Sequence, residues 1–174
     1  GVRWAGGGAG GACWLVVAGL NPASTCNRRV GAGAARPAAS FAAAVRRNYS
    51  FRDGAVSTFV KRGLGRGGLL LRMADEKNFL VLLVDTTSGE AVLSSFRDGK
   101  PAELGRGKAS LARGWERFGV TAAGSALSVF FGDQKMFDAV DPRPVAGRTG
   151  LATAGPGETR FDEFILEPAD GPKK

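Results

Sequence analysis

The side chains that carry most enzyme chemistry are scarce in this chain. It has 174 residues, no histidine and two cysteines, Cys13 and Cys26. The lack of histidine excludes the common Ser-His-Asp and Cys-His catalytic arrangements, and without a C-x-x-C motif it nearly excludes a Cys/His zinc site. Cys13 and Cys26 form either one disulfide, worth about 3 kcal/mol, or two buried free thiols. We expect the disulfide, because little else constrains the Gly-rich segment around them.

Carboxylates are the remaining candidates for acid–base chemistry. Cleavage of a glycosidic bond usually needs two carboxylates that face each other across the sugar, about 5 Å or 6.5–9.5 Å apart. Asp162 and Glu163 are adjacent, so an extended strand would place them on opposite faces. Asp75 and Glu76 lie in a predicted turn. We interpret these groups as solvated turn carboxylates and predict no catalytic residue, the alternative being a set assembled from distant strands.

The charge is distributed unevenly. The net charge is +8, yet residues 1–50 contain six Arg and no acidic residue, so residues 51–174 are close to neutral. The basic segment is either a patch for an anionic partner or a solvated Arg-rich surface. We favour the solvated surface and do not expect nucleic-acid binding, because no aromatic side chain is interleaved with Arg28, Arg29 and Arg36 to stack on bases.

Short apolar runs separated by Gly, Asp, Asn and Ser are typical of antiparallel strands and turns. The run 41–45 is compatible with a helix or a strand, and we interpret it as a strand because so many strands surround it. No apolar run is long enough to cross a bilayer. The predicted strands are Cys13–Ala18, Phe41–Val45, Val56–Lys61, Gly68–Met73, Phe79–Asp85, Glu90–Phe96, Pro101–Leu104, Trp115–Thr121, Ala126–Phe131, Lys135–Ala139, Gly147–Thr153 and Thr159–Glu167.

This pattern predicts an all-β fold, a two-sheet antiparallel β-sandwich of the jelly-roll type. We expect a single domain over residues 1–174, with a Gly/Arg-rich N-terminal segment at 1–40 and a frayed tail at 168–174. Residues 105–108 are predicted to be a loop. The pentapeptide SFRDG occurs at 50–54 and again at 95–99; we interpret the match as shared turn chemistry rather than duplication.

Alternation along the predicted strand 115–121 separates two faces. Phe118 lies on the face that we expect in the core, and Arg117 lies on the other face together with Trp115. Because of its size, we expect Trp115 to pack into the core at the entrance of the strand rather than to form an exposed platform. We also expect Val129 and Ile165 to be buried between the sheets.

Several motifs resemble those of concanavalin A-like lectin/glucanase domains, which include the laminin-G-like domains. The stretch 67–72 followed by Asp75 and 78–79 is similar to the "GGxxFR…D…NYY" motif of that superfamily. Residues 115–120 resemble "WHxLxV", although Glu116 replaces the usual His. The hairpin in 127–134 reads Gly-Asp where Asp-Gly is usual. The segments 147–151 and 161–164 resemble the closing "GRxGL…FDDF". The likeness runs from about Phe41 to Glu167, and the nearest branch is the bacterial 3-keto-disaccharide hydrolase-type domain of unknown function.

The resemblance implies a concanavalin A-like fold and interaction with a glycan or another protein subunit. It implies a non-catalytic carbohydrate-binding or structural β-sandwich domain; the alternatives are a hydrolase of 3-keto-glycosides and an anion-binding module that uses the N-terminal Arg residues. We therefore lean against an enzyme and expect secretion to the periplasm, medium or cell surface.

The candidate ligand-binding residues are Arg72, Asp75, Asn78 and Arg97. They flank one predicted hairpin and its neighbourhood. The alternative is that Arg72 pairs with an acidic residue while Asp75 and Asn78 cap a turn. We predict no metal or cofactor; calcium, which related folds often bind through oxygen ligands, is the alternative, but the chain has no D-x-[DN]-x-[DN]-G loop.

Overall fold

The computed structural model describes residues 14–20, 41–46, 49–63, 65–111, 114–155 and 159–169, giving only the strand path for 14–20 and Phe41. Within these ranges the chain forms strands and turns and no helix, which confirms the predicted all-β class. The strands are β1 (Trp14–Leu20), β2 (Phe41–Arg46), β3 (Gly54–Lys61), β4 (Arg66–Asp75), β5 (Asn78–Asp85), β6 (Glu90–Arg97), β7 (Lys100–Lys108), β8 (Trp115–Ala123), β9 (Ala126–Phe131), β10 (Gln134–Val140), β11 (Arg148–Ala154) and β12 (Phe161–Pro168).

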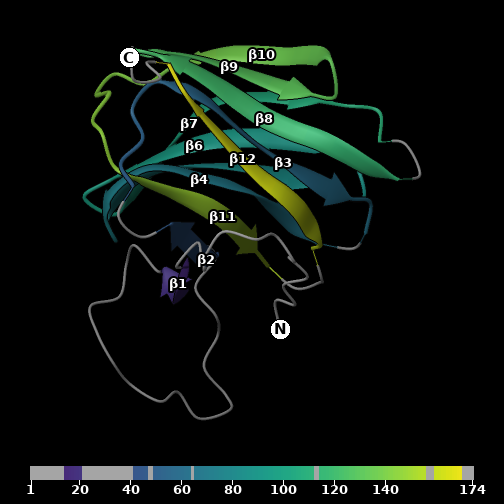
Figure 1. The fold of residues 1–174 in the computed structure, drawn as a ribbon, viewed down its shortest axis with the longest axis horizontal. Coiled ribbons are helices and arrows are strands. Elements are labelled where there is room, and N and C mark those ends of the chain that lie inside the picture. Colours follow the sequence, from purple (N-terminus) through teal and green to yellow (C-terminus); the bar gives the residue numbers. More distant parts are fainter. Residues whose placement is uncertain are drawn as a thin grey trace, which may run out of the picture.

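The strands form two antiparallel sheets, which are the two layers seen in Figure 1. The larger sheet has the order β1-β2-β11-β4-β5-β6-β7, and the smaller sheet has the order β10-β9-β8-β3-β12. Consecutive strands pair through tight turns in β4–β7 and in β8–β10, whereas β11 inserts between β2 and β4. This arrangement confirms the predicted two-sheet sandwich.

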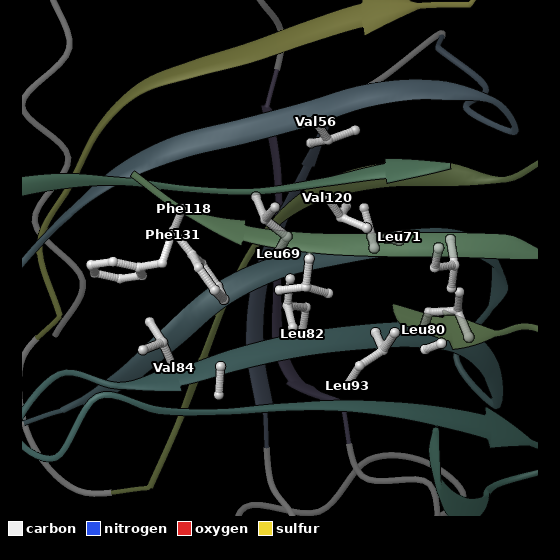
Figure 2. Packing of buried hydrophobic residues seen from close by; sticks show 14 of the residues in the cluster. Val56, Leu69, Leu71, Leu80, Leu82, Val84, Leu93, Phe118, Val120 and Phe131 are labelled. Atoms are coloured by element: carbon white, nitrogen blue, oxygen red, sulfur yellow. The ribbon is translucent and has the colours of Figure 1, made fainter. Parts of the chain in front are cut away.

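The main core lies between the sheets. Figure 2 shows Leu69, Leu82 and Leu93 of the larger sheet pointing toward side chains of the smaller one, among them Val120 and Phe118. Each of these five side chains is at most 2% exposed. Burying one such side chain contributes roughly 1.5–3 kcal/mol, so this layer provides most of the driving force for folding.

Ile165 is an exception to the predicted core. It is half-buried and lies in register with Ser57, on the outer face of the smaller sheet. A β-bulge between Asp162 and Ile165 contains Glu163, whose φ is +46°. The extra residue reverses the alternation, so that Phe164, not Ile165, packs against the core.

The larger sheet is apolar on both faces. A second buried cluster on its outer face includes Val45, Leu70, Val81 and the stacked pair Phe79 and Phe96, whose ring centroids are 4.6 Å apart. These five side chains are at most 2% exposed. These side chains close the middle of this face to solvent, which directs attention to the outer face of the smaller sheet.

Strand β7 is longer than predicted. Residues 105–108, expected to be a loop because of their glycines, continue the strand and pair with β6. A Cβ atom at Gly105 or at Gly107 would lie 2.8 Å from the ring of Phe137 on β10. The two glycines thus make room for an aromatic ring that packs across the strand.

The two SFRDG segments have different structures, as interpreted from the sequence. Asp98 and Gly99 form the hairpin turn between β6 and β7 with φ of +51° and +78°, whereas Asp53 immediately precedes β3. At the other end of the chain, Pro168 belongs to β12 and the amide of Ala169 donates to the carbonyl of Asp53 at 3.2 Å.

The predictions on Cys13 and Cys26, and those on Arg28, Arg29 and Arg36, lie outside the described residues. In the described part of the chain, no helix has the length and apolarity needed to cross a membrane.

Candidate functional site

The side chain of Arg72 is fully buried and forms an ion pair with Asp141 inside the protein. It sits at a bulge in β4 with φ of +49°, which turns its side chain away from the outer face of the sheet. Its guanidinium donates to the carbonyls of Arg52 (Nη2, 2.7 Å) and Gly124 (Nη2, 2.7 Å) and to the carboxylate of Asp141 (Nη1, 2.8 Å). With 0% exposure, this guanidinium is not accessible to a ligand.

Asp141 joins Arg72 to Arg97. One carboxylate oxygen accepts from Arg72, and the other accepts from Nη2 of Arg97 at 2.7 Å and from the backbone amide of Arg143 at 3.0 Å. Asp141 has no exposed surface and Arg97 retains 17% of its own. The predicted alternative, an acidic partner for Arg72, is therefore what the structure shows.

Asp75 and Asn78 cap the turn between β4 and β5. The Asn78 amide lies 3.0 Å from both carboxylate oxygens of Asp75, and the backbone amide of Lys77 donates to Asp75 at 2.7 Å. The hydrogen bond from the Lys77 amide lowers the pKa of Asp75. The structure thus divides the four predicted residues into a turn cap and a buried ion-pair network. Binding of a ligand by this group remains a prediction.

The outer face of the smaller sheet combines aromatic and polar side chains. Strand register places Ser57, Gly119 and Phe130 in one row across β3, β8 and β9. The next row contains Phe59 and Arg117. Since alternate residues share a face, this surface carries the residues of β8 that point away from the core.

A hollow of about 230 Å³ lies on this face, and we call it the Arg117 hollow. Gly119 has no side chain and therefore leaves the floor of the hollow open. A Cβ atom at this position would lie 2.8 Å from Cβ of Ser57, so a larger residue would crowd Ser57. Nε of Arg117 donates to the Ser57 hydroxyl at 3.1 Å. The lining residues are Ala55, Val56, Ser57, Arg117, Gly119, Val120, Thr121, Phe130, Gly132 and Glu167.

The prediction that Trp115 packs into the core is wrong. Trp115 is 42% exposed and shares the outer face with Arg117, two residues along β8. Two residues of strand span about 7 Å, so the backbone of Trp115 lies about that far from Arg117, which lines the hollow. The ammonium of Lys61, in register on β3, is 5.9 Å from the ring centroid. The outer face of the smaller sheet is open at this point, and the indole is therefore available to a ligand.

The hollow offers hydrogen-bond donors and acceptors around an aromatic wall. Arg117 has donors beyond the one used on Ser57, Thr121 has a hydroxyl, and Glu167 contributes an exposed carboxylate. The hollow is smaller than the roughly 300–1,000 Å³ of sites for drug-sized ligands. It therefore suits one small polar unit with an apolar face.

Sequence reasoning identified part of this face and missed the rest. Alternation placed Arg117 together with Trp115, but it gave no reason to add Phe130 or Glu167, which come from β9 and β12. The available signal was Gly119 in the middle of a strand, which often marks a close approach to a backbone or a ligand.

The structure also locates the carboxylates considered for catalysis. Asp162 and Glu163 are exposed on β12, an edge strand, and the amide of Glu163 donates to Asp162 at 2.9 Å. Among the residues that the structure describes, no group of three or more His, Cys, Asp or Glu side chains is arranged to hold a metal ion.

Comparison with known proteins extends only to the fold. No family model matches the chain, and no curated protein matches it. Among solved structures it is similar to the carbohydrate-binding module CBM66 from Bacillus subtilis, with a TM-score of 0.59 and 20% identity over 72% of this chain and 79% of the module.

Two further solved structures share the architecture. A Bacillus subtilis protein of unknown function with a galectin-like fold has a TM-score of 0.56 and 14% identity, covering 72% of this chain and 76% of its own. The β-glucanase of Bacillus licheniformis has a TM-score of 0.52 and 8% identity, covering 67% and 58%. The 3-keto-disaccharide hydrolase-type branch remains a prediction. The fold of this chain is a concanavalin A-like jelly roll.

Proposed function

We propose that this protein is a non-catalytic carbohydrate-binding domain whose site is the outer face of the smaller sheet, at Trp115 and the Arg117 hollow. The observation that carries the proposal is the exposed indole of Trp115, 42% accessible, on the same face as the Arg117 hollow and two residues from Arg117 along β8. A large aromatic ring left in solvent loses the free energy of burial, so such a ring often serves recognition.

The chemistry of this surface suits a sugar. One face of a pyranose presents C–H groups that pack on an aromatic ring, while its rim presents hydroxyls that both donate and accept hydrogen bonds. The guanidinium of Arg117 donates only and the carboxylate of Glu167 accepts only. Together they can donate a hydrogen bond to a sugar hydroxyl and accept one from it. The ring of Phe130 provides a second apolar contact.

The similar structures support this class of function. One of them is a carbohydrate-binding module and another has a galectin-like fold. An extracellular or cell-surface location, where such domains meet polysaccharides, fits the proposal. Because fold alone does not determine function, the proposal rests on the side chains of the site.

The same surface favours binding over cleavage. Of the residues that line the Arg117 hollow, only Glu167 is a carboxylate. Hydrolysis of a glycosidic bond usually needs a second one facing it across the sugar. We therefore expect a bound neutral oligosaccharide to remain intact, and the chemistry of 3-keto-glycosides finds no support in this hollow.

A glycan array of neutral oligosaccharides tests the proposal, followed by titration calorimetry on the best ligand. We expect Trp115→Ala and Arg117→Ala each to weaken binding at least tenfold, equivalent to about 1.4 kcal/mol. Val145→Ala is the matched control, because Val145 is similarly exposed, at 43%, but lies in the β10–β11 loop. Equal binding by wild type and Trp115→Ala, or an array without a ligand, would contradict the proposal.

A further inference from the structure

A second hollow, of about 540 Å³, lies at the end of the sandwich where β5 turns into β6; we call it the Arg62 hollow. Three separate segments contribute to it: the residue after β3, the β5–β6 turn, and the end of β7 with the residues that follow. Its lining consists of Arg62, Thr87, Ser88, Lys108, Ala109, Ser110 and Leu111.

Hydrogen bonds hold the first two segments together. Thr86 is fully buried, its amide donates to the carbonyl of Gly65 at 2.9 Å, and its hydroxyl donates to the same carbonyl at 2.6 Å. The hydroxyl of Thr87 donates to the carbonyl of Gly63 at 3.0 Å. The position of Arg62, the residue before Gly63, is therefore tied to the β5–β6 turn.

The third segment is fixed by Gly89. Its φ is +77°, and its carbonyl accepts from the amide of Ala109 at 2.9 Å. A Cβ at residue 89 would collide with the carbonyl of Ala109. Only glycine allows this approach, which brings Lys108 and Ser110 against the turn.

The hollow has an unbalanced positive charge. The carboxylates near it are paired with other cations: Asp85 with Arg66 at 3.3 Å, and Glu90 with Arg106 at 3.0 Å. Arg62 and Lys108 are exposed and belong to none of the ion pairs formed among the described residues. Two cationic residues thus line the hollow together with the hydroxyl-bearing Thr87, Ser88 and Ser110, and its lining contains no carboxylate.

We propose that the Arg62 hollow binds the oxyanion group, a sulfate ester or a carboxylate, of an acidic polysaccharide. Arg62 and Lys108 neutralise the group through charge-assisted hydrogen bonds, and the three hydroxyls serve neighbouring sugar hydroxyls. A volume of about 540 Å³ accommodates a sugar unit together with its charged group. No aromatic side chain lines the hollow to stack on a base, which favours a polysaccharide over a nucleic acid. The proposal does not depend on the Arg117 hollow.

The test measures binding of the full chain to dextran sulfate, to polygalacturonate and to neutral dextran. We expect a sulfated or a carboxylated polymer to bind, neutral dextran not to bind at this site, and Arg62→Ala/Lys108→Ala to weaken binding of the acidic polymer at least tenfold. Preference between the two acidic polymers identifies the oxyanion. Both side chains are exposed and form no ion pair with the residues that the structure describes, so thermal unfolding of the double variant should match wild type.

Lys100→Ala/Arg143→Ala is the matched control, because it removes one Lys and one Arg that are also exposed. Lys100 begins β7 and Lys108 ends it, so the control acts at the opposite end of that strand. Equal losses in the two double variants would show attraction by net charge alone and would overturn the site. Failure of both acidic polymers to bind would also overturn it, as would duplex DNA that binds at the hollow more tightly than either polymer. Arg62→Ala/Lys108→Ala should keep its binding of neutral oligosaccharides, which separates this site from the Arg117 hollow.

Discussion

Arg72 shows how far a single residue can be interpreted from sequence. A buried guanidinium needs a charge partner, and pairing with an acidic residue was the alternative to ligand binding that the sequence offered for Arg72. Asp141 lies 69 residues away in the chain, and nothing local indicates it. The left-handed backbone at Arg72 costs on the order of 1–3 kcal/mol, and the ion pair and carbonyl contacts of its guanidinium offset that strain.

Asp141→Asn should be strongly destabilising. The substitution removes a charge that neutralises the fully buried Arg72 and also contacts Arg97, and breaking one partner of a buried pair costs roughly 3–5 kcal/mol. Urea denaturation monitored by circular dichroism measures the change. Asp138→Asn serves as control, because the Asp138–Lys135 pair is exposed on both sides. A loss no larger than in that control would show that the network does not stabilise the fold.

For Trp115, the sequence predicted the correct face of the strand but the wrong degree of burial. Alternation correctly placed it on the face of Arg117, away from Phe118, yet its size suggested burial. Whether an outer face is covered depends on what packs over it. The outer face of the larger sheet is buried at Leu70, whereas Trp115 on the smaller sheet is 42% exposed.

At the scale of elements, β7 corrects the interpretation of glycine as a loop signal. Gly105 and Gly107 are in strand conformation and leave space for the ring of Phe137 from β10. The residue that requires these glycines is some 30 positions later in the chain, so a local interpretation assigns them to a turn.

Gly105→Ala should destabilise the protein by about 1–3 kcal/mol through overpacking against Phe137. In a Phe137→Ala background the same substitution should cost much less, because the clash is gone. Thermal unfolding of the four proteins in this double-mutant cycle gives the coupling. Equal costs in both backgrounds would mean that the ring does not exclude a side chain at 105.

The turn between β5 and β6 depends on Asp85 in a pH-dependent way. Hydrogen bonds from the backbone amides of Ser88 and Thr87, with Arg66 nearby, lower the pKa of Asp85 from its ordinary value of 3.8. A carboxyl whose pKa is lower in the folded than in the unfolded protein stabilises the fold at pH values above the unfolded-state pKa. This stabilisation is lost as the pH falls through the pKa of the folded state.

We therefore expect Asp85→Asn to lower the free energy of unfolding at pH 7. On acidification below about pH 4, the variant should lose less of its stability than the wild type loses. Urea midpoints at pH 7 and pH 3 for wild type and variant provide the comparison. Part of the acid loss should remain, because the pKa of Asp75 is lowered as well. Parallel pH dependences of the two proteins would contradict this role.

At the scale of the whole molecule, one network connects the two sheets. Arg72 and Arg97 belong to the larger sheet, while Gly124 lies in the β8–β9 turn of the smaller sheet. Asp53, just before β3, accepts from the amide of Gly124 at 2.8 Å. The common core and this network should make the sheets unfold together.

Unfolding should accordingly be a single transition, with coincident urea curves from far-ultraviolet circular dichroism and from hydrogen exchange of β5 and β8 amides. The larger sheet supplies β5 and the smaller sheet supplies β8. Protection lost from one strand well before the other would show that the sheets are separate cooperative units.

The amino-acid sequence alone determined the sandwich class and most of the strands and turns, because side-chain alternation and turn residues are local properties of the chain. Tertiary structure decided which arginine is buried, which tryptophan is exposed and which loops form a basic hollow. Asp141, Phe130 and Lys108 each act on residues distant in the chain. Such contacts arise only when strand order and bulges set which side chains meet, and a bulge of one residue is enough to reverse a face, as Ile165 shows.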